Sequence, residues 1–405
     1  MSDKPLVTLS LIALLAFAAH SLAQQNVQIN LKKTIPAPPS DERLLFVGIE
    51  NDEIRSLSTD ADVIRTAKAG RVSTDALSGL VVGFEKDVTS RFLALVTKGN
   101  TSRKSDDLKL TALDGIGEKR FEMKIPWAND EPFPTIAVSG KDGAIALGKS
   151  AVNEVRFFTA DGALKRHVRL FENNEYSTER TLHIEADARS GLFAVAAIRT
   201  PASPGMLEPE SNSKLFLFNS AGASLWETTL KEPSVYALKF FPNGTRLLTA
   251  TYDAYRENGM IKKTRILDEN GAVVKEHDFL FRDAVFDETN GAALLYEKGK
   301  FYALDLDSGE IIAQGEGEKD ELILAASFSA NKSASAILFA KEVFKDGGLR
   351  YESPVLRFFE SGGALVGNYR PKGERLRKPF FAISEDRQAI VLVTAQRFEI
   401  LDWVE

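Results

Sequence analysis

The chain has 405 residues, 44% of them hydrophobic, and its 57 acidic and 51 basic residues give a net charge of −6. This charge is mild and dispersed, so nucleic acid is not expected as a partner. The chain has no cysteine, which excludes disulfides, and its four histidines show no metal-ligand spacing. No metal site and no cofactor are therefore predicted.

Residues 1–23 have the pattern of a secretory signal peptide. Lys4 precedes the apolar run of residues 9–19, and Ser21 and Ala23 are the small residues that cleavage after Ala23 requires. A run of about 11 apolar residues is shorter than the roughly 20 that span a bilayer, so a membrane anchor is the weaker interpretation. The sequence predicts a periplasmic or secreted protein with no transmembrane segment after cleavage.

The next segment, residues 24–43, is polar and ends in a proline-rich stretch around Pro36 and Pro39. Such a stretch is typical of an extended leader. A single folded domain is expected over residues 44–405.

Within this domain, an apolar strand, a polar turn and a second apolar strand recur seven times. The strand pairs are 81–84 with 92–95, 136–138 with 144–147, 184–186 with 192–195, 237–240 with 247–249, 283–286 with 292–295, 325–328 with 336–338, and 381–383 with 389–392. Self-similarity at a period of roughly 40–50 residues, built from strands alone, is typical of a β-propeller.

Most of these hairpins are followed by a second hairpin whose turn ends in glycine. The glycines are Gly115, Gly162, Gly222, Gly271, Gly309 and Gly363. Glycine accepts the positive φ that such turns require. Each unit therefore has four strands, A to D, and the predicted fold is an all-β, seven-bladed β-propeller of four-stranded antiparallel blades.

The last unit is expected to lack strand D, because the chain ends soon after Trp403. We expect an N-terminal strand from residues 44–65 to close this blade, which would remove the open edges of the ring.

The connections between strands B and C are the long and variable ones, at residues 199–211, 252–263 and 341–354. Function tends to lie on loops held by a rigid scaffold, so this face is the candidate binding face, although the loops could also have lengthened without a function. Tyrosine and arginine are enriched at recognition sites. The candidate binding residues are Tyr252, Asp253, Tyr255, Arg256, Lys341, Phe344, Arg350 and Tyr351 on these connections, and Arg180 on an expected connection between strand D of one unit and strand A of the next.

Several turns resemble those of known propeller families. Residues 240–248, with Phe241-Pro242-Asn243-Gly244, resemble the A–B turn of WD-type and Tol-system-type propellers. Residues 302–310 resemble the C–D turn of pyrroloquinoline-quinone-type repeats, and Gly222 and Trp226 keep that family's spacing. The resemblance implies a disc of blades around a central channel that holds proteins or ligands.

Two motifs suggest chemistry but are better explained by the repeat. Residues 143–150 match the phosphate-binding P-loop pattern, but they occupy a strand B position and are followed by a strand rather than a helix. Asp305 and Asp307 suggest a calcium loop, but they also fit a C–D turn.

The sequence thus favours an exported, non-catalytic binding or scaffold protein, monomeric, whose partner is another envelope or extracellular protein. The alternative is a propeller hydrolase or lyase that acts on a glycan or peptide at the channel mouth. A quinone-dependent dehydrogenase is a third option, weakened because the quinone ligands are missing. Carboxylates that converge in the channel with a histidine or arginine would favour an enzyme, and an apolar or plugged channel would favour a scaffold.

Overall fold

The structure is a computed structural model, and it describes most of the chain from residue 28 to residue 404. The described residues are 28–37, 44–50, 53–58, 62–66, 72–76, 79–87, 91–99, 108–114, 118–128, 131–171, 177–201, 213–242, 244–254, 259–288, 290–329, 334–345, 348–360, 363–371, 375–384 and 388–404. Strands dominate these residues, and the helical element among them is the short 3-10 turn η1 (Ser150–Val152).

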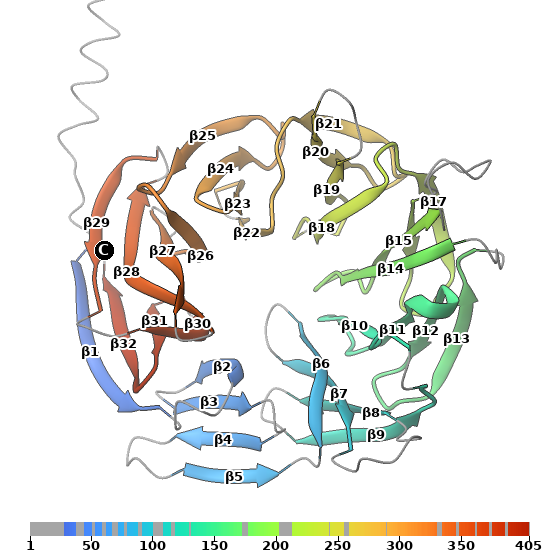
Figure 1. Cartoon of the computed structure of the whole chain (residues 1–405), viewed down its shortest axis with the longest axis horizontal. Coiled ribbons are helices and arrows are strands. Elements are labelled where there is room, and N and C mark those ends of the chain that lie inside the picture. Colours follow the sequence, from blue (N-terminus) through green and yellow to red (C-terminus); the bar gives the residue numbers. More distant parts are fainter. Residues whose placement is uncertain are drawn as a thin grey trace, which may run out of the picture.

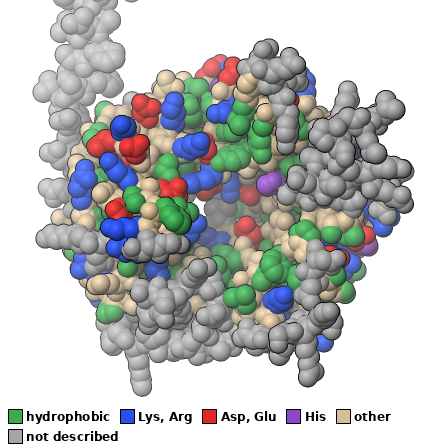
Figure 2. All heavy atoms as spheres, viewed as in Figure 1, with side chains coloured by type: hydrophobic (Ala, Val, Ile, Leu, Met, Phe, Trp, Pro, Cys, Tyr) green, Lys and Arg blue, Asp and Glu red, His purple; other side chains and the backbone are tan. Residues whose placement is uncertain are grey.

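The strands form antiparallel sheets that are arranged as a ring around a central channel (Figure 1). Figure 2 shows the same channel as a hollow in the molecular surface. In each four-stranded unit, strand A lies at the centre of the ring and strand D lies at its rim. We call these four-stranded units blades and number them in chain order.

Blades 1 to 4 are built from residues 44–229. Blade 1 contains β2 (Leu44–Glu50), β3 (Glu53–Ser58), β4 (Asp62–Thr66) and β5 (Val72–Ala76). Blade 2 contains β6 (Leu80–Lys86), β7 (Phe92–Lys98), β8 (Leu108–Asp114) and β9 (Lys119–Ile125). Blade 3 contains β10 (Thr135–Val138), β11 (Ile145–Lys149), β12 (Glu154–Phe158) and β13 (Leu164–Arg169). Blade 4 contains β14 (Ser177–Ala186), β15 (Phe193–Pro201), β16 (Lys214–Phe218) and β17 (Ser224–Thr229).

Blades 5 to 8 complete the ring. Blade 5 contains β18 (Ser234–Phe240), β19 (Leu247–Asp253), β20 (Ile261–Leu267) and β21 (Val273–His277). Blade 6 contains β22 (Asp283–Asp287), β23 (Ala292–Glu297), β24 (Lys300–Asp305) and β25 (Ile311–Glu316). Blade 7 contains β26 (Glu321–Phe328), β27 (Ala334–Lys345), β28 (Gly348–Glu360) and β29 (Leu365–Tyr369). Blade 8 contains β30 (Leu376–Ile383), β31 (Ala389–Thr394), β32 (Arg397–Val404) and β1 (Gln28–Pro36).

The propeller fold is confirmed, and all seven predicted hairpins are present as the A and B strands of blades 2 to 8. Counted as hydrogen-bonded sheets, the ring has seven members, six of four strands and one of eight. Counted as four-stranded blades, it has eight, because a single bridge between Tyr351 and Leu376 joins blades 7 and 8 into one sheet. The additional blade is blade 1, whose strands the repeat pattern did not reveal.

Closure of the last blade by an N-terminal strand is also confirmed, but the strand comes from a different segment. Strand β1 pairs antiparallel with β32 from Gln28↔Val404 to Pro36↔Arg397. The prediction that residues 44–65 supply this strand was wrong, because those residues pair with one another in blade 1. Residues 28–36 therefore belong to the sheet, although they lie within the segment predicted as an extended leader.

The glycine turns behave as the sequence predicts. Gly162, Gly222, Gly271, Gly309 and Gly363 have φ between 69° and 88°, a region that other residues rarely adopt. A Cβ atom at Gly222 would also lie 2.5 Å from the ring of Phe157, in the neighbouring blade. Gly115 lies outside the described residues. These turns fix the register of each C–D hairpin.

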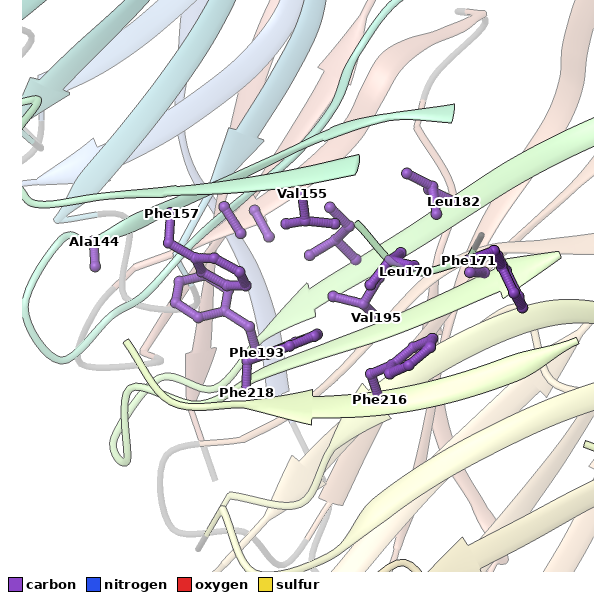
Figure 3. Close-up of a cluster of buried hydrophobic side chains, with 14 residues drawn as sticks. Ala144, Val155, Phe157, Leu170, Phe171, Leu182, Phe193, Val195, Phe216 and Phe218 are labelled. Atoms are coloured by element: carbon purple, nitrogen blue, oxygen red, sulfur yellow. The ribbon is translucent and has the colours of Figure 1, made fainter. Parts of the chain in front are cut away.

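The hydrophobic core lies between neighbouring blades rather than in one central mass. Figure 3 shows one cluster, in which side chains of blades 3 and 4 pack face to face. The ring of Phe157 on β12 lies 5.7 Å from that of Phe193 on β15 and 5.2 Å from that of Phe218 on β16, between ring centroids. Because each blade buries one face against each neighbour, the ring leaves the channel free for polar side chains.

Candidate functional site

The segment of residues 341–354, predicted to be a loop, is instead a continuation of the β27–β28 hairpin. Its pairing runs from Lys341↔Glu352 through Val343↔Arg350 to Lys345↔Gly348. The physical reason lies in the sequence, where the β-favouring residues Val343, Phe344 and Tyr351 flank a glycine-containing turn. We call residues 341–352 the blade 7 hairpin. It carries four of the nine predicted binding residues: Lys341, Phe344, Arg350 and Tyr351.

The blade 7 hairpin has two unlike faces, because successive residues of a strand point to opposite sides. Phe344 pairs with Leu349, and Glu342 pairs with Tyr351, so these four side chains share one face. Phe344 is 73% exposed and Leu349 is 61% exposed, the two highest values among the large hydrophobic side chains of the described residues. Tyr351 packs edge-to-face against Phe380 of β30, with 4.8 Å between the ring centroids.

Tyr252 and Asp253 lie at the end of β19, beside a second group of polar aromatic side chains. The Tyr252 ring contacts the Tyr236 ring at 6.3 Å between centroids. The Tyr236 hydroxyl lies 3.0 and 3.1 Å from the two carboxylate oxygens of Glu297, in blade 6. Burial, together with this carboxylate, raises the pKa of Tyr236. Asp253 is almost fully buried, so its carboxylate is not displayed at the surface.

The other predicted binding residues, Arg180, Tyr255 and Arg256, do not add to the surface of the blade 7 hairpin. Arg180 lies within strand β14, paired with Arg199, rather than in a connection between blades. Tyr255 and Arg256 lie outside the described residues. The structure therefore places the blade 7 hairpin residues together and separates them from Arg180 in blade 4.

A charged cluster in the channel was not predicted. Glu85, Glu185, Lys239 and Asp283 lie on the innermost strands of blades 2, 4, 5 and 6. The Lys239 Nζ lies 3.3 Å from Glu185 Oε1 and 3.5 Å from Asp283 Oδ1. Figure 2 shows acidic and basic side chains side by side around the hollow. Strand A positions facing the channel carry these groups, which is a signal that the hairpin pattern contained.

The charges of this cluster are coupled. The Glu185 carboxylate raises the pKa of Lys239 well above its usual value, so the amine stays protonated and is not a nucleophile. Burial within the channel, with a further contribution from the charge of Glu185, raises the pKa of Glu85 to about 7. His183 lies on the same strand as Glu185, and burial lowers its pKa, so it is neutral at pH 7.

The structure thus meets part of the criterion for an enzyme, since three carboxylates and a histidine line the channel. Two of these carboxylates, Glu185 and Asp283, share one lysine in ion pairs. Such pairing occupies the groups that a substrate would contact. Burial raises the pKa of Glu185 as well as that of Glu85, and Glu85, at about 7, has the pKa of a general acid or base.

Two further ion pairs are buried and act in folding. Arg265 of β20 binds Glu232 through both Nη atoms, one of them 2.8 Å from Glu232 Oε1, and both side chains are largely shielded from solvent. Arg357 of β28 binds Glu321 in the same manner, at 2.6 and 3.1 Å. In both blades the arginine comes from strand C, and the glutamate lies at or just before strand A. These pairs therefore fasten the inner strand of a blade to its third strand.

The two motifs that suggested chemistry are parts of the repeat, as expected. Residues 145–149 of the P-loop match form strand β11, and Lys149 binds Glu131 at 2.9 Å instead of a phosphate. Asp305 caps its own C–D turn by accepting hydrogen bonds from the backbone N–H and the hydroxyl of Ser308, both at 2.7 Å.

Searches for two other features concern the described part of the chain alone. Within it, no three acidic, histidine or cysteine side chains are grouped so that they could hold a metal ion. None of the helical residues described forms a helix long and apolar enough to cross a membrane.

Comparisons with known proteins agree with the architecture. The chain is similar to the crystal structure of the C-terminal WD40 domain of Sif2, with a TM-score of 0.59 over 93% of this chain and 99% of that domain. In its fold, the chain resembles a WD-repeat β-propeller. The sequence identity is 11%, so the similarity shows the fold alone. A looser similarity, with a TM-score of 0.45 and 14% identity, is to a structure described as the eukaryotic initiation factor, and covers 83% of this chain and 91% of that one. No protein-family model and no curated protein matches the sequence.

Proposed function

We propose that this chain is a non-catalytic binding or scaffold protein whose partner, another protein, docks on the face that carries the B–C connections. The WD40-like fold supports this class of function, because propellers of this kind present a rigid ring of connections for recognition. The observation that carries the proposal is the pair Phe344 and Leu349, which lies on a B–C connection and is more exposed than any other large hydrophobic pair described. Exposed apolar surface bordered by polar side chains is typical of protein interaction sites.

Export is part of the proposal and is supported by the signal-peptide pattern of residues 1–23, which lie outside the described residues. In that case the partner is an envelope or extracellular protein, and the propeller acts as a monomer. A protease-protection assay on intact and permeabilised cells tests the compartment. Protection that persists after the outer barrier is permeabilised would contradict export.

A hydrolase or lyase is the weaker function. Two observations favour it, the gathering of three carboxylates and His183 in the channel and the near-neutral pKa of Glu85, but Glu185 and Asp283 are bound to Lys239. A Glu85→Gln variant that lost a measured hydrolytic activity would reverse this ranking.

The proposed function is tested by co-purification from envelope extracts with wild-type protein and a variant in which residues 343–350 are replaced by an Asn-Gly turn. The shortened hairpin keeps the Tyr351–Phe380 contact, so we expect the propeller to fold. We expect a partner to be recovered with the wild type, to rebind as a purified protein, and to be lost from the shortened variant. A Leu164→Glu variant on the rim of blade 3 is the matched control and should retain the partner. Equal recovery by the shortened variant, or no partner with either protein, would contradict the proposal.

A further inference from the structure

Tyr236 of blade 5 occupies a β-bulge on the innermost strand of its blade. The pairing of β18 with β19 skips this residue, so Tyr236 has no partner on β19. Bulges re-aim a side chain and are frequent next to functional sites. Blades 2 and 7 have the same bulge, where it holds the aliphatic residues Val82 and Leu324. Blade 5 therefore departs from the repeat by placing an exposed tyrosine at this position.

The Tyr236 side chain meets Tyr252 and Glu297 on the face that carries the B–C connections. The two tyrosine rings are nearly perpendicular, with an interplanar angle of 81° and 6.3 Å between centroids. The Tyr236 hydroxyl donates to the Glu297 carboxylate of blade 6, at 3.0 and 3.1 Å from its two oxygens. A carboxylate bound to the hydroxyl polarises the phenol, which strengthens the attraction of the ring for a cation. We call these three side chains the Tyr236 cluster.

Blade 6, which adjoins blade 5 in the ring (Figure 1), already contains a tyrosine and a carboxylate that hold a cation. The Tyr296 hydroxyl donates to Asp283 Oδ2 at 3.1 Å, and the Arg282 guanidinium lies over the Tyr296 ring, 5.5 Å from its centroid. Arg282 also donates to the backbone carbonyl oxygens of Ile323 and Leu324, at 2.8 and 3.3 Å. The chain thus fills this arrangement with an arginine of its own.

The Tyr236 cluster has no such cation. Within the described part of the chain, no lysine or arginine lies over the ring of Tyr236 or of Tyr252. Lys298 and Lys300, in the turn after Glu297, are exposed, and neither is within ion-pair distance of its carboxylate. An ionised carboxylate has about four acceptor sites, so Glu297 can bind a further donor beside the Tyr236 hydroxyl.

Arg282 bears on which cation the Tyr236 cluster can take. Its charge acts on both Tyr236 and Tyr351, so the cluster lies near the base of the blade 7 hairpin, and an incoming cation must also overcome this charge. A guanidinium is better suited than an ammonium, because its planar fork can bind a carboxylate through two hydrogen bonds and stack on an aromatic ring.

We infer that the Tyr236 cluster binds an arginine side chain of the partner protein. The guanidinium would stack on the Tyr236 ring and pair with Glu297, as Arg282 stacks on Tyr296 in blade 6. This inference rests on the proposed function, which takes the partner to be a protein that docks on this face, and it specifies one residue of that partner.

Surface plasmon resonance with the full propeller tests the inference. Immobilised heptapeptides of glycine and serine differ only in their central residue, which is arginine, lysine, glutamate or citrulline, an uncharged residue of nearly the same shape as arginine. We expect the arginine peptide to bind most tightly. The citrulline peptide should bind at least about tenfold more weakly, because it loses both the ion pair and the cation–π contact.

Variants of the propeller locate the site. Tyr236→Leu gives the bulge the residue that blade 7 has there, so we expect it to fold, and it should weaken binding of the arginine peptide about fivefold. Glu297→Gln should cause a loss of similar size, because it removes the charge that pairs with the guanidinium. Tyr236→Phe keeps the ring and should cause a smaller loss. Glu269→Gln, at the C–D turn of blade 5 on the opposite face, is the matched control and should bind as the wild type does.

Equal binding of the arginine and citrulline peptides, tightest binding of the glutamate peptide, or absence of binding by every peptide would overturn the inference. Binding of the arginine peptide that survives both Tyr236→Leu and Glu297→Gln would also overturn it. The proposed function would stand in each case if a protein partner is still lost when the hairpin is shortened. If the arginine peptide binds as expected while shortening affects no partner, the proposed role of the hairpin fails and the arginine site is retained.

Discussion

The channel and the blade 7 hairpin use charge in opposite ways. In the channel, Lys239 satisfies two carboxylates from neighbouring blades, so its charge is committed to holding inner strands together. On the hairpin, Lys341 and Lys345 are exposed next to Phe344 and have no carboxylate partner among the described residues. Removing one member of a shielded ion pair destabilises a fold, because the other charge is left without a partner. Unpaired charges beside exposed apolar surface stay available to a partner. We therefore infer that the channel charges hold the blades together and that the hairpin binds a partner.

The largest expected effect concerns the buried ion pair between Arg265 and Glu232 in blade 5. Arg265→Met should lower the free energy of unfolding by about 3–5 kcal/mol, because it leaves Glu232 charged and unpaired in the protein interior. Chemical denaturation followed by circular dichroism measures this change. Lys345→Met, on the hairpin, is the control and should change stability by no more than about 0.5 kcal/mol. Equal losses of stability in the two variants would contradict the claim that buried ion pairs hold the fold together and that the hairpin charges do not.

Lys239→Met should have a smaller effect, a loss of about 1–2 kcal/mol, because the channel admits some water to Glu185 and Asp283. The double variant Lys239→Met with Glu185→Gln should recover part of this loss, since it removes one of the two stranded charges. A double-mutant cycle in the same denaturation assay gives the coupling. Strictly additive losses would show that the ion pair is not part of the architecture.

Substitution on the hairpin should leave stability nearly unchanged while removing recognition. Phe344→Ser should alter the free energy of unfolding by less than about 0.5 kcal/mol, because its side chain is 73% exposed. The same variant should lose the partner in co-purification. Tyr351→Ser should instead destabilise the propeller, because Tyr351 packs against Phe380. A destabilised Phe344→Ser protein would place Phe344 in the core of the fold.

The smallest expected effect is on pH dependence. The pKa of Glu85 in the folded protein is about 7, above the usual glutamate value of 4.5, so the folded state holds this proton more tightly than the unfolded state. The contribution of Glu85 to stability is therefore full at low pH and is lost as pH rises from about 4.5 through about 7. Glu85→Gln should flatten this decline, as measured by denaturation midpoints at pH 5 and pH 8. A steeper loss of stability with pH in the Glu85→Gln variant would contradict the raised pKa of Glu85.

The sequence was sufficient to predict the repeating hairpins, because alternation of apolar residues and glycine turns are local signals. Blade 1 was missed because β5 (Val72–Ala76) and its neighbours carry many polar residues and few glycines. The closing strand was misplaced because only Ile35 of β1 is a buried apolar residue among those whose side chains are described, which left little hydrophobic pattern to read.

The candidate site was only partly predictable for a different reason. Phe344 and Tyr351 could be chosen from residue type, but the alternation around them was read as a loop rather than a hairpin. Glu85, Glu185, Lys239 and Asp283 are far apart in the chain, and only the closed ring brings them together. The hairpin pattern places each of them on or next to a strand A, but it does not indicate which strand A side chains meet across the channel.

Site-specific photo-crosslinking tests the central claim most directly. Phe344→p-benzoylphenylalanine places a crosslinker on the blade 7 hairpin, and Leu164→p-benzoylphenylalanine places one at an equally accessible position on the rim, where Leu164 is 56% exposed. The account predicts that irradiation in cells links a partner protein to position 344 and none to position 164. A partner linked only to position 164, or no crosslink at position 344, would contradict it.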